Sequence, residues 1–82
     1  MTDAIAIVEK NSREDVRIAI DEFRGTQLVD IRVFADFNSN EADTRTPTKK
    51  GVSLKIERLP DLIRALEKAK EEAARRGLLP GG

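Results

Sequence analysis

Hydrophobic and polar residues alternate along three segments of this chain, which is the pattern of a β-strand with one buried face. The alternating segments are residues 16–23, 27–37 and 51–56, and a short apolar run rich in β-branched residues covers 4–9. Gly25 and Thr26 turn the chain between the first two alternating segments, whereas residues 38–48 form a longer, turn-rich loop. Four successive strands with short connections predict an antiparallel meander.

From residue 57 onward the spacing of hydrophobic residues changes to three and four, which indicates an amphipathic α-helix. The apolar stripe consists of Leu59, Leu62, Ile63, Leu66, Ala69, Lys70 and Ala73. Pro60 suits the first helical turn, and Gly77 suits the position just after the last. A helix over residues 57–76 would be about 30 Å long. A small sheet cannot cover so long a stripe, so we expect two copies of the chain to pack helix against helix.

The predicted fold is therefore α+β: a four-stranded antiparallel sheet followed by one long C-terminal helix, forming a homodimer. We expect a single domain over residues 1–82, with its core at about 4–76 and loose ends at 1–3 and 80–82. A chain of 82 residues buries a small share of its surface and is marginally stable alone. Because it has no cysteine, a disulfide cannot compensate, which again favours a partner subunit.

Composition excludes several classes of function. The chain has no histidine and no cysteine, which rules out Ser-His-Asp and Cys-His catalysis and also histidine-based or thiolate metal sites. It contains no glycine-rich phosphate loop, so we predict no catalytic residue, no cofactor and no metal. No apolar run reaches membrane-spanning length and no signal peptide is recognisable. We expect a cytoplasmic protein without a membrane partner, associated with the nucleoid in a bacterium.

The segment that starts at Asp36 begins like a calcium-binding loop, with Asn38 and Asn40 at alternate positions. Glu41 then stands where that loop needs a glycine, and Pro47 stands where it needs a glutamate. A polar turn built on Asp and Asn side chains is the better interpretation.

The 15 basic and 15 acidic side chains cancel, which taken alone argues against a nucleic-acid partner. Their distribution is uneven, however, because residues 44–56 contain four cations and no acid. These cations are Arg45, Lys49, Lys50 and Lys55. Neighbouring hydroxyl groups can donate to phosphates, and Gly51 permits close approach of a backbone. The segment is either a phosphate-binding edge or an ordinary solvated loop.

Phe23 and Phe34 are the candidates for base stacking. Phe23 precedes Arg24 at a strand end, and Phe34 shares its strand parity with charged residues rather than with the apolar positions. Aromatic rings among cations on an open sheet suit single-stranded nucleic acid, because every base offers a π-face. The alternative is that both rings belong to the core, where most phenylalanines lie.

Asp30 and Arg32 lie two residues apart on one side of a predicted strand. Either they form a cross-strand charge network that fixes the register, or Asp30 orients Arg32 toward a phosphate, and both can hold. Phe37 has the parity of the apolar positions in the same segment, which predicts a place in the core.

Three blocks follow one another along the chain: Phe23-Arg24-Gly25, Asp30-Ile31-Arg32 and Lys49-Lys50-Gly51-Val52-Ser53-Leu54. In this order, with a long helix behind them, they resemble the transcriptional positive cofactor four family over about residues 13–72. The resemblance implies a curved antiparallel sheet followed by a helix, with two subunits paired largely through their helices. It further implies two adjacent grooves that hold unpaired nucleic-acid strands. Without a long Ser- and Lys-rich extension, the chain resembles the compact bacterial or viral members.

Carried over to single residues, the resemblance implies that Phe23 is the family's stacking phenylalanine. Four cations match its basic residues: Arg24, Arg32, and the pair Lys49 and Lys50 before Gly51. The predicted nucleic-acid-binding residues, from pattern and resemblance together, are Phe23, Arg24, Arg32, Phe34, Arg45, Lys49, Lys50 and Gly51.

The chain departs from the pattern of the eukaryotic members at three positions. These members carry a stacking tryptophan where Ala35 stands, a lysine where Thr26 stands and a basic residue where Asp21 stands. Each departure implies weaker binding. Phe34 and Phe37 are the candidates to replace the tryptophan.

The leading hypothesis is a homodimeric protein that binds single-stranded DNA or RNA with little sequence preference and acts in transcription or genome maintenance. The alternative is a dimeric adaptor that docks onto the transcription machinery through its sheet edge or charged helix, without binding nucleic acid itself. A net charge of zero favours the alternative, and the three ordered blocks favour the first hypothesis.

Overall fold

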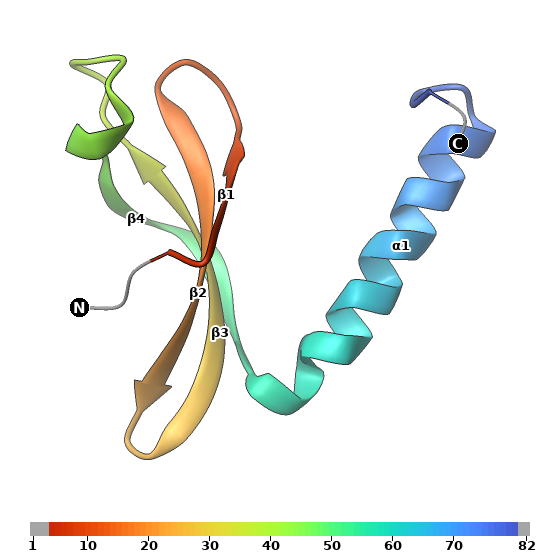
Figure 1. Ribbon diagram of the computed structural model, residues 1–82, viewed down its shortest axis with the longest axis horizontal. Coiled ribbons are helices and arrows are strands. Elements are labelled where there is room, and N and C mark those ends of the chain that lie inside the picture. Colours follow the sequence, from red (N-terminus) through yellow and green to blue (C-terminus); the bar gives the residue numbers. More distant parts are fainter. Residues whose placement is uncertain (1–3, 81–82) are drawn as a thin grey trace.

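The computed structural model describes residues 4–80 and shows a four-stranded antiparallel sheet followed by a long helix (Figure 1). The strands are β1 (Ala6–Glu9), β2 (Glu14–Phe23), β3 (Thr26–Ala35) and β4 (Thr46–Lys55), and the helix is α1 (Leu59–Arg75). The strands lie in the order β1-β2-β3-β4, so the predicted meander is confirmed. Of the expected loose ends, residues 1–3 and 81–82 lie outside the described residues.

The loop between β3 and β4 is shorter than the sequence predicted. β4 begins at Thr46 rather than Gly51, because the ladder continues with Phe34 opposite Pro47 and Ala35 opposite Thr46. Pro47 has no backbone N–H to donate. It is tolerated there because β4 is an edge strand, and the backbone groups on its outer side pair with no other strand of the sheet. The remaining loop contains one 3-10 turn, Ala42–Thr44.

Phe37 is not part of the core, and the prediction that placed it there is wrong. β3 ends at Ala35, and Asp36 then turns the chain by accepting a hydrogen bond at Oδ1 from the backbone N–H of Asn38, at 2.9 Å. This confirms the predicted Asx-type turn. Strand parity no longer applies beyond the turn, and Phe37 is 64% exposed.

One face of the sheet is hydrophobic, and we call it the apolar face. It carries Val16, Ile18, Ile20, Val29, Ile31, Val33, Val52 and Leu54, which the strand register places opposite or beside one another. Val29 at its centre is 1% exposed. Among the described residues only one other hydrophobic residue, Ala35, is buried, so this core is small.

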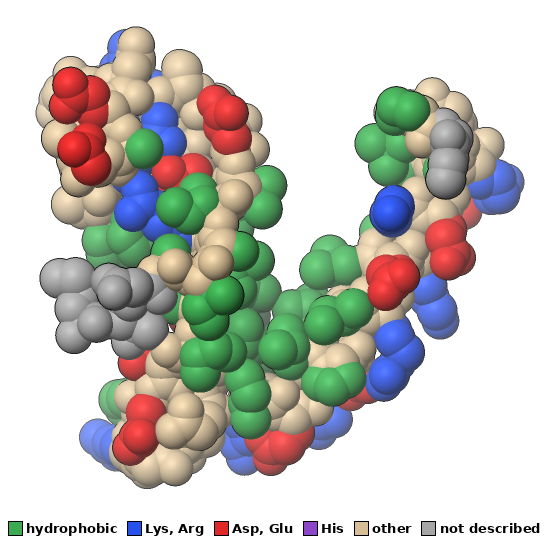
Figure 2. All heavy atoms as spheres, in the orientation of Figure 1, with side chains coloured by type: hydrophobic (Ala, Val, Ile, Leu, Met, Phe, Trp, Pro, Cys, Tyr) green, Lys and Arg blue, Asp and Glu red, His purple; other side chains and the backbone are tan. Residues whose placement is uncertain are grey.

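Helix α1 leaves the end of β4 and diverges from the sheet, with its hydrophobic side turned toward the apolar face (Figure 1, Figure 2). Hydrophobic side chains gather on both sides of the resulting hollow in Figure 2. No residue of α1 is buried, and Ile63 and Leu66 are 47% and 59% exposed. The apolar stripe of α1 is therefore half covered at Leu59 and Leu62 and exposed at Ile63 and Leu66.

The ends of α1 follow the sequence prediction closely. A single 3-10 turn, Ile56–Arg58, leads into the helix, and Pro60 lies in its first turn. At the other end Gly77 adopts a φ of 76°, its N–H donates to Ala74, and Leu78 donates to Ala73. This is a Schellman ending, which the absence of a Cβ at Gly77 permits. In residues 4–80 no helix combines the length and the apolar character needed to cross a membrane.

Candidate nucleic-acid interface

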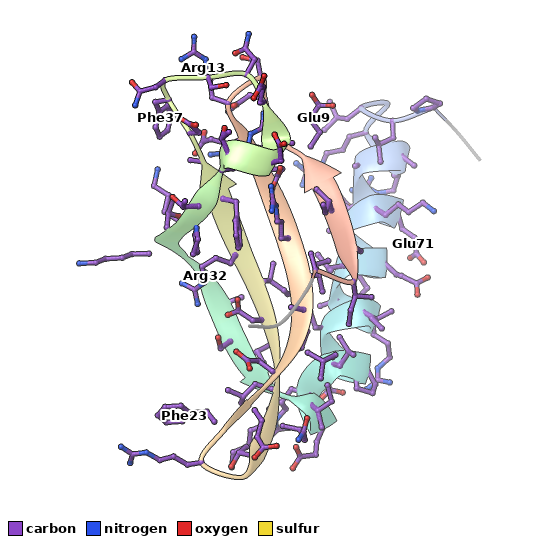
Figure 3. The ribbon with its side chains drawn as sticks, turned by 60° about the vertical axis from the view of Figure 1, so that its left-hand side comes forward. Glu9, Arg13, Phe23, Arg32, Phe37 and Glu71 are labelled. Carbon is purple, nitrogen blue, oxygen red and sulfur yellow. The ribbon has the colours of Figure 1, made fainter. Side chains whose placement is uncertain are left out.

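The opposite face of the sheet, which we call the polar face, carries most of the residues that the sequence singled out. The register aligns Arg17 with Arg32, Asp15 with Phe34, and Asp30 with Ser53 across the three strands. Phe23 and Arg32 project on the side away from α1 (Figure 3). The polar face thus lies on the side of the sheet that α1 does not cover, and the β3–β4 loop covers its end near Asp15.

Phe23 and Arg24 form the tip of the β2–β3 hairpin at one end of the polar face. Arg24 and Gly25 both adopt positive φ angles, 51° and 81°, which is the two-residue turn that suits the twist of a hairpin. Phe23 is 61% exposed, and the Cζ of Arg24 lies 5.1 Å from its ring centroid. Phe23 is therefore a solvent-facing ring beside a cation and contributes little to the core of this chain.

Arg32 is held in the middle of the polar face by Asp30. Its Nη2 lies 2.9 Å from Asp30 Oδ1, and Ser53 Oγ donates to the same oxygen at 2.6 Å. Arg32 Nη1 donates to the Thr48 carbonyl at 3.3 Å. The hydrogen bonds from Arg32 lower the pKa of Asp30 below its ordinary value, against the effect of burial. The ion pair therefore lies within β3 rather than across strands, and Ser53 and the Thr48 carbonyl connect it to β4, toward which the guanidinium of Arg32 is aimed.

A bulge in β4 displays the basic pair. Thr48, Lys49 and Lys50 stand opposite the single residue Val33 of β3, whose carbonyl accepts a hydrogen bond from Thr48 Oγ1 at 2.8 Å. Bulges bend a strand and redirect its side chains, and both lysines are exposed here.

Gly51 closes the bulge opposite Arg32, and its role is steric. A Cβ at this position would overlap the carbonyl oxygen of Ile31 and press against the Cα of Arg32. Any larger residue would push β4 away from β3. Gly51 therefore allows the close strand approach on which the position of the basic pair depends.

Arg45, in contrast, is the one predicted site residue whose side chain is almost completely buried. Its side chain is 6% exposed; Nη1 lies 2.8 Å from Asp15 Oδ2, and Nη2 donates to the Ser12 carbonyl at 2.7 Å. Its Nε has no hydrogen-bond partner within residues 4–80. In this position Arg45 holds the end of the β3–β4 loop against β2.

Arg17 is a residue that the sequence prediction missed. Its Nε and Nη2 donate to the two carboxylate oxygens of Asp15 at 2.7 and 3.3 Å, and Nη2 also donates to the Ala42 carbonyl at 2.7 Å. Its Cζ lies 4.4 Å from the centroid of the Phe34 ring. The alternation along β2 already placed Arg17 opposite the apolar positions, and that parity was the available signal.

Two ion-paired carboxylates of the polar face, the buried Asp15 and the half-buried Asp30, predict a loss of stability in acid. Hydrogen bonding to Arg17 lowers the pKa of Asp15, burial opposes this, and the bond to Arg45 lowers it further. The pKa of Asp30 is also lowered.

A carboxyl group whose folded pKa lies below its unfolded pKa stabilises the fold at higher pH, and this contribution disappears as pH falls through that range. We expect a constant melting temperature between pH 7 and pH 5 and a decline below about pH 4. Thermal melts at constant ionic strength test this, and a melting temperature unchanged at pH 3 would contradict it.

Within residues 4–80, no group of three or more acidic side chains lies close enough together to hold a metal ion. The site chemistry that these residues offer consists of exposed cations, one exposed aromatic ring and one ring covered by a guanidinium.

The sequence matches the family model described as Transcriptional Coactivator p15 (PC4) over residues 10–65. Among solved structures, the chain is similar to BPSL1147, a PC4 homolog from Burkholderia pseudomallei, with 30% identity and a TM-score of 0.75. That match covers 87% of this chain and 92% of the homolog. No curated protein sequence gives a significant match.

The chain is also similar to the bacteriophage T5 homolog of the eukaryotic transcription coactivator PC4, a protein implicated in recombination-dependent DNA replication. The two share 29% identity with a TM-score of 0.62, and the match covers 92% of this chain and 85% of the phage protein. The family model spans more than half of the chain, and the solved relatives share its sheet and helix over most of their length. The chain therefore belongs to the PC4 family.

Proposed function

We propose that this protein binds single-stranded DNA or RNA along the polar face, with little sequence preference, and acts as a dimeric transcription cofactor or in genome maintenance. The observation that carries the proposal is the exposed Phe23–Arg24 tip on the same sheet as Arg32 and the bulged Lys49–Lys50 pair. Membership of the PC4 family supports it, as does the phage relative implicated in DNA replication.

A net charge of zero is compatible with this function because many acids are already paired. Asp15 and Asp30 form ion pairs with arginines, so they neutralise charge within the protein rather than repel a phosphate. In contrast, Arg24, Lys49 and Lys50 take part in none of the ion pairs among the described residues. These three cations are the ones most available to a nucleic-acid backbone.

The proposed contacts with the nucleic acid are of two kinds, base stacking and phosphate binding. Phe23 stacks on a base, because every base presents a π-face to an exposed ring. Arg24, Arg32, Lys49 and Lys50 contact phosphates. Gly51 sets the bulge that directs the basic pair, Arg45 supports the neighbouring loop from its buried position, and Phe34 offers a second ring.

We further propose that a second copy of the chain covers the apolar stripe of α1. No residue of the stripe is buried in the single chain, the core contains few buried residues, and the sequence has no cysteine to form a disulfide. Burial of apolar area is the main favourable term in subunit association. In the dimer the two polar faces would each remain open for a nucleic-acid strand.

Replacing Arg24 with asparagine should raise stability and lower affinity. Arg24 occupies the left-handed region, which costs a residue with a side chain roughly 1–2 kcal/mol, and Asn-Gly is a preferred sequence for this turn. The same change removes a cation beside Phe23. We expect a higher melting temperature and weaker binding to a labelled single-stranded oligonucleotide. An unchanged affinity would show that Arg24 does not contact the ligand.

Replacing both Lys49 and Lys50 with alanine should reduce the salt dependence of binding. Each lost phosphate contact flattens the slope of log affinity against log salt by about 0.7 for single strands. The matched control replaces Arg64 and Lys68 with alanine, since these two cations lie on the exposed side of α1 and their removal changes the net charge equally. If the slope is the same in the wild type and in the Lys49/Lys50 variant, the basic pair does not contact the strand.

The adaptor function is the second candidate, and the edge strand β1 favours it. Ile5, Ile7 and Val8 are exposed by 67%, 57% and 56%, and an exposed edge strand can accept a partner strand. Stoichiometric capture of a transcription protein, together with no shift of a single-stranded oligonucleotide, would select the adaptor function over nucleic-acid binding.

A further inference from the structure

Phe34 differs from Phe23 because a guanidinium already covers one face of its ring. The Cζ of Arg17 lies 4.4 Å from the ring centroid, which is within the range of a cation–π contact. Because Arg17 occupies that side of the ring, the side cannot also receive a base, and the half-buried Phe34 keeps part of its side chain exposed. A base that stacks on Phe34 must therefore use the other face of the ring.

Arg17 is fixed rather than mobile in this position. Three hydrogen bonds, two to Asp15 and one to the Ala42 carbonyl, engage its Nε and Nη2. Asp15 is 2% exposed and is itself held by Arg45. Asp15 in β2 and Ala42 in the β3–β4 loop thus hold the planar guanidinium together. The ring that it covers, Phe34, belongs to the neighbouring strand β3.

Phe34 also lies far from the hairpin tip. Thr26 is the cross-strand partner of Phe23, and Phe34 lies eight residue steps further along β3, which corresponds to about 26 Å along a strand. A base at Phe34 would therefore be a different nucleotide from the base at Phe23.

We propose that Phe34, backed by Arg17, is a second base-stacking position, and that Arg17 is a positioning residue which fixes the ring with one face open to a nucleobase. The proposal rests on the proposed function, since it names a second contact on the same nucleic-acid strand. Arg17 acts through Phe34 and does not itself contact a phosphate. Its charge is compensated by Asp15, which distinguishes it from Lys49 and Lys50.

A double-mutant cycle on the full chain tests the role of Arg17. Arg17→Met keeps the length of the side chain but removes the guanidinium, and Asp15 keeps Arg45 as its partner. We expect Arg17→Met to weaken binding of a single-stranded oligonucleotide by about 2- to 30-fold, the range of a cation–π contact. In a Phe34→Leu background, the same change should have no further effect. Neither variant should change the slope of log affinity against log salt.

Arg64→Met, on the exposed side of α1, is the matched control and should bind like the wild type. If Arg17→Met weakens binding equally with or without Phe34, and flattens the salt slope, Arg17 is a phosphate contact and the proposal is wrong. Unchanged affinity per folded molecule in Arg17→Met would also overturn it. Failure of the wild type to bind at all would instead overturn the proposed function.

A measurement on the wild-type protein covers the case in which the variants fail to fold. In NMR spectra, addition of the oligonucleotide should shift the ring signals of both Phe23 and Phe34, while the Nε–H signal of Arg17 stays protected from exchange. Shifts at Phe23 with none at Phe34 would contradict a second stacking position. Loss of the protection at Arg17 would contradict its fixed role.

Discussion

Replacing Leu62 with aspartate and Leu66 with glutamate is expected to unfold the protein and to abolish the dimer in the same step. Both leucines belong to the apolar stripe of α1, in which Leu62 is half-buried and Leu66 is exposed within the described chain. In the proposed dimer, these positions meet the second copy. Burying a charge without a partner there costs several kcal/mol, a large fraction of the roughly 5–15 kcal/mol that stabilises a typical domain.

Light scattering and circular dichroism at micromolar concentration measure both effects on one sample. Lys68→Glu on the exposed side of α1 is the control, and it should remain dimeric and folded. The small core of the single chain is the reason that folding and association are expected to be coupled. A wild-type protein that is a stable, fully folded monomer would contradict the proposed dimer.

Phe23→Ala should lose affinity while keeping its melting temperature. Loss of one base–aromatic stack costs roughly 1–3 kcal/mol of binding free energy. Truncation of a buried phenylalanine would instead cost roughly 3–5 kcal/mol of folding stability. Because Phe23 is 61% exposed, we expect the first outcome.

Phe37→Ala is the matched control, since Phe37 is exposed to a similar extent, 64%, but lies beyond the end of β3. It should change neither affinity nor melting temperature. A loss of affinity in Phe37→Ala would instead make Phe37 the ring that replaces the tryptophan. Fluorescence anisotropy and thermal melting of both variants give the comparison. A large fall in melting temperature for Phe23→Ala, with affinity per folded molecule intact, would assign Phe23 to a core or a subunit interface.

The sheet and the helix were predictable because their patterns are local. Alternation along β2 and β3 reports which side chains face the interior, and the change of spacing after Ile56 marks the helix. Pro60 and Gly77 mark its ends for reasons that concern single residues, namely a missing N–H and a missing Cβ. None of these features needs knowledge of a distant part of the chain.

The features that were missed depend on contacts between distant segments. Arg45 was predicted from the charge of its own segment, yet its burial follows from Asp15, 30 residues earlier. The early start of β4 depends on pairing with Ala35 after a bulge, which alternation within β4 does not reveal. Phe37 was misplaced because the strand ended before it.

The same long-range contacts explain how acids and bases are distributed on the polar face. Asp15 and Asp30 use their charge to fix Arg17, Arg32 and Arg45 in place. The exposed cations at the hairpin tip and the bulge remain for a ligand. A count of charges along the sequence cannot separate these two uses, which is why a neutral chain can still present a basic surface.

A titration of the wild-type protein into labelled single-stranded and double-stranded oligonucleotides, followed by fluorescence anisotropy across a salt series, tests whether the polar face binds unpaired strands. We predict tighter binding to the single strand, with an affinity that falls linearly on a log–log plot by about 0.7 per phosphate contact. No binding to the single strand at low salt, or equal affinity for the duplex, would contradict the proposed function.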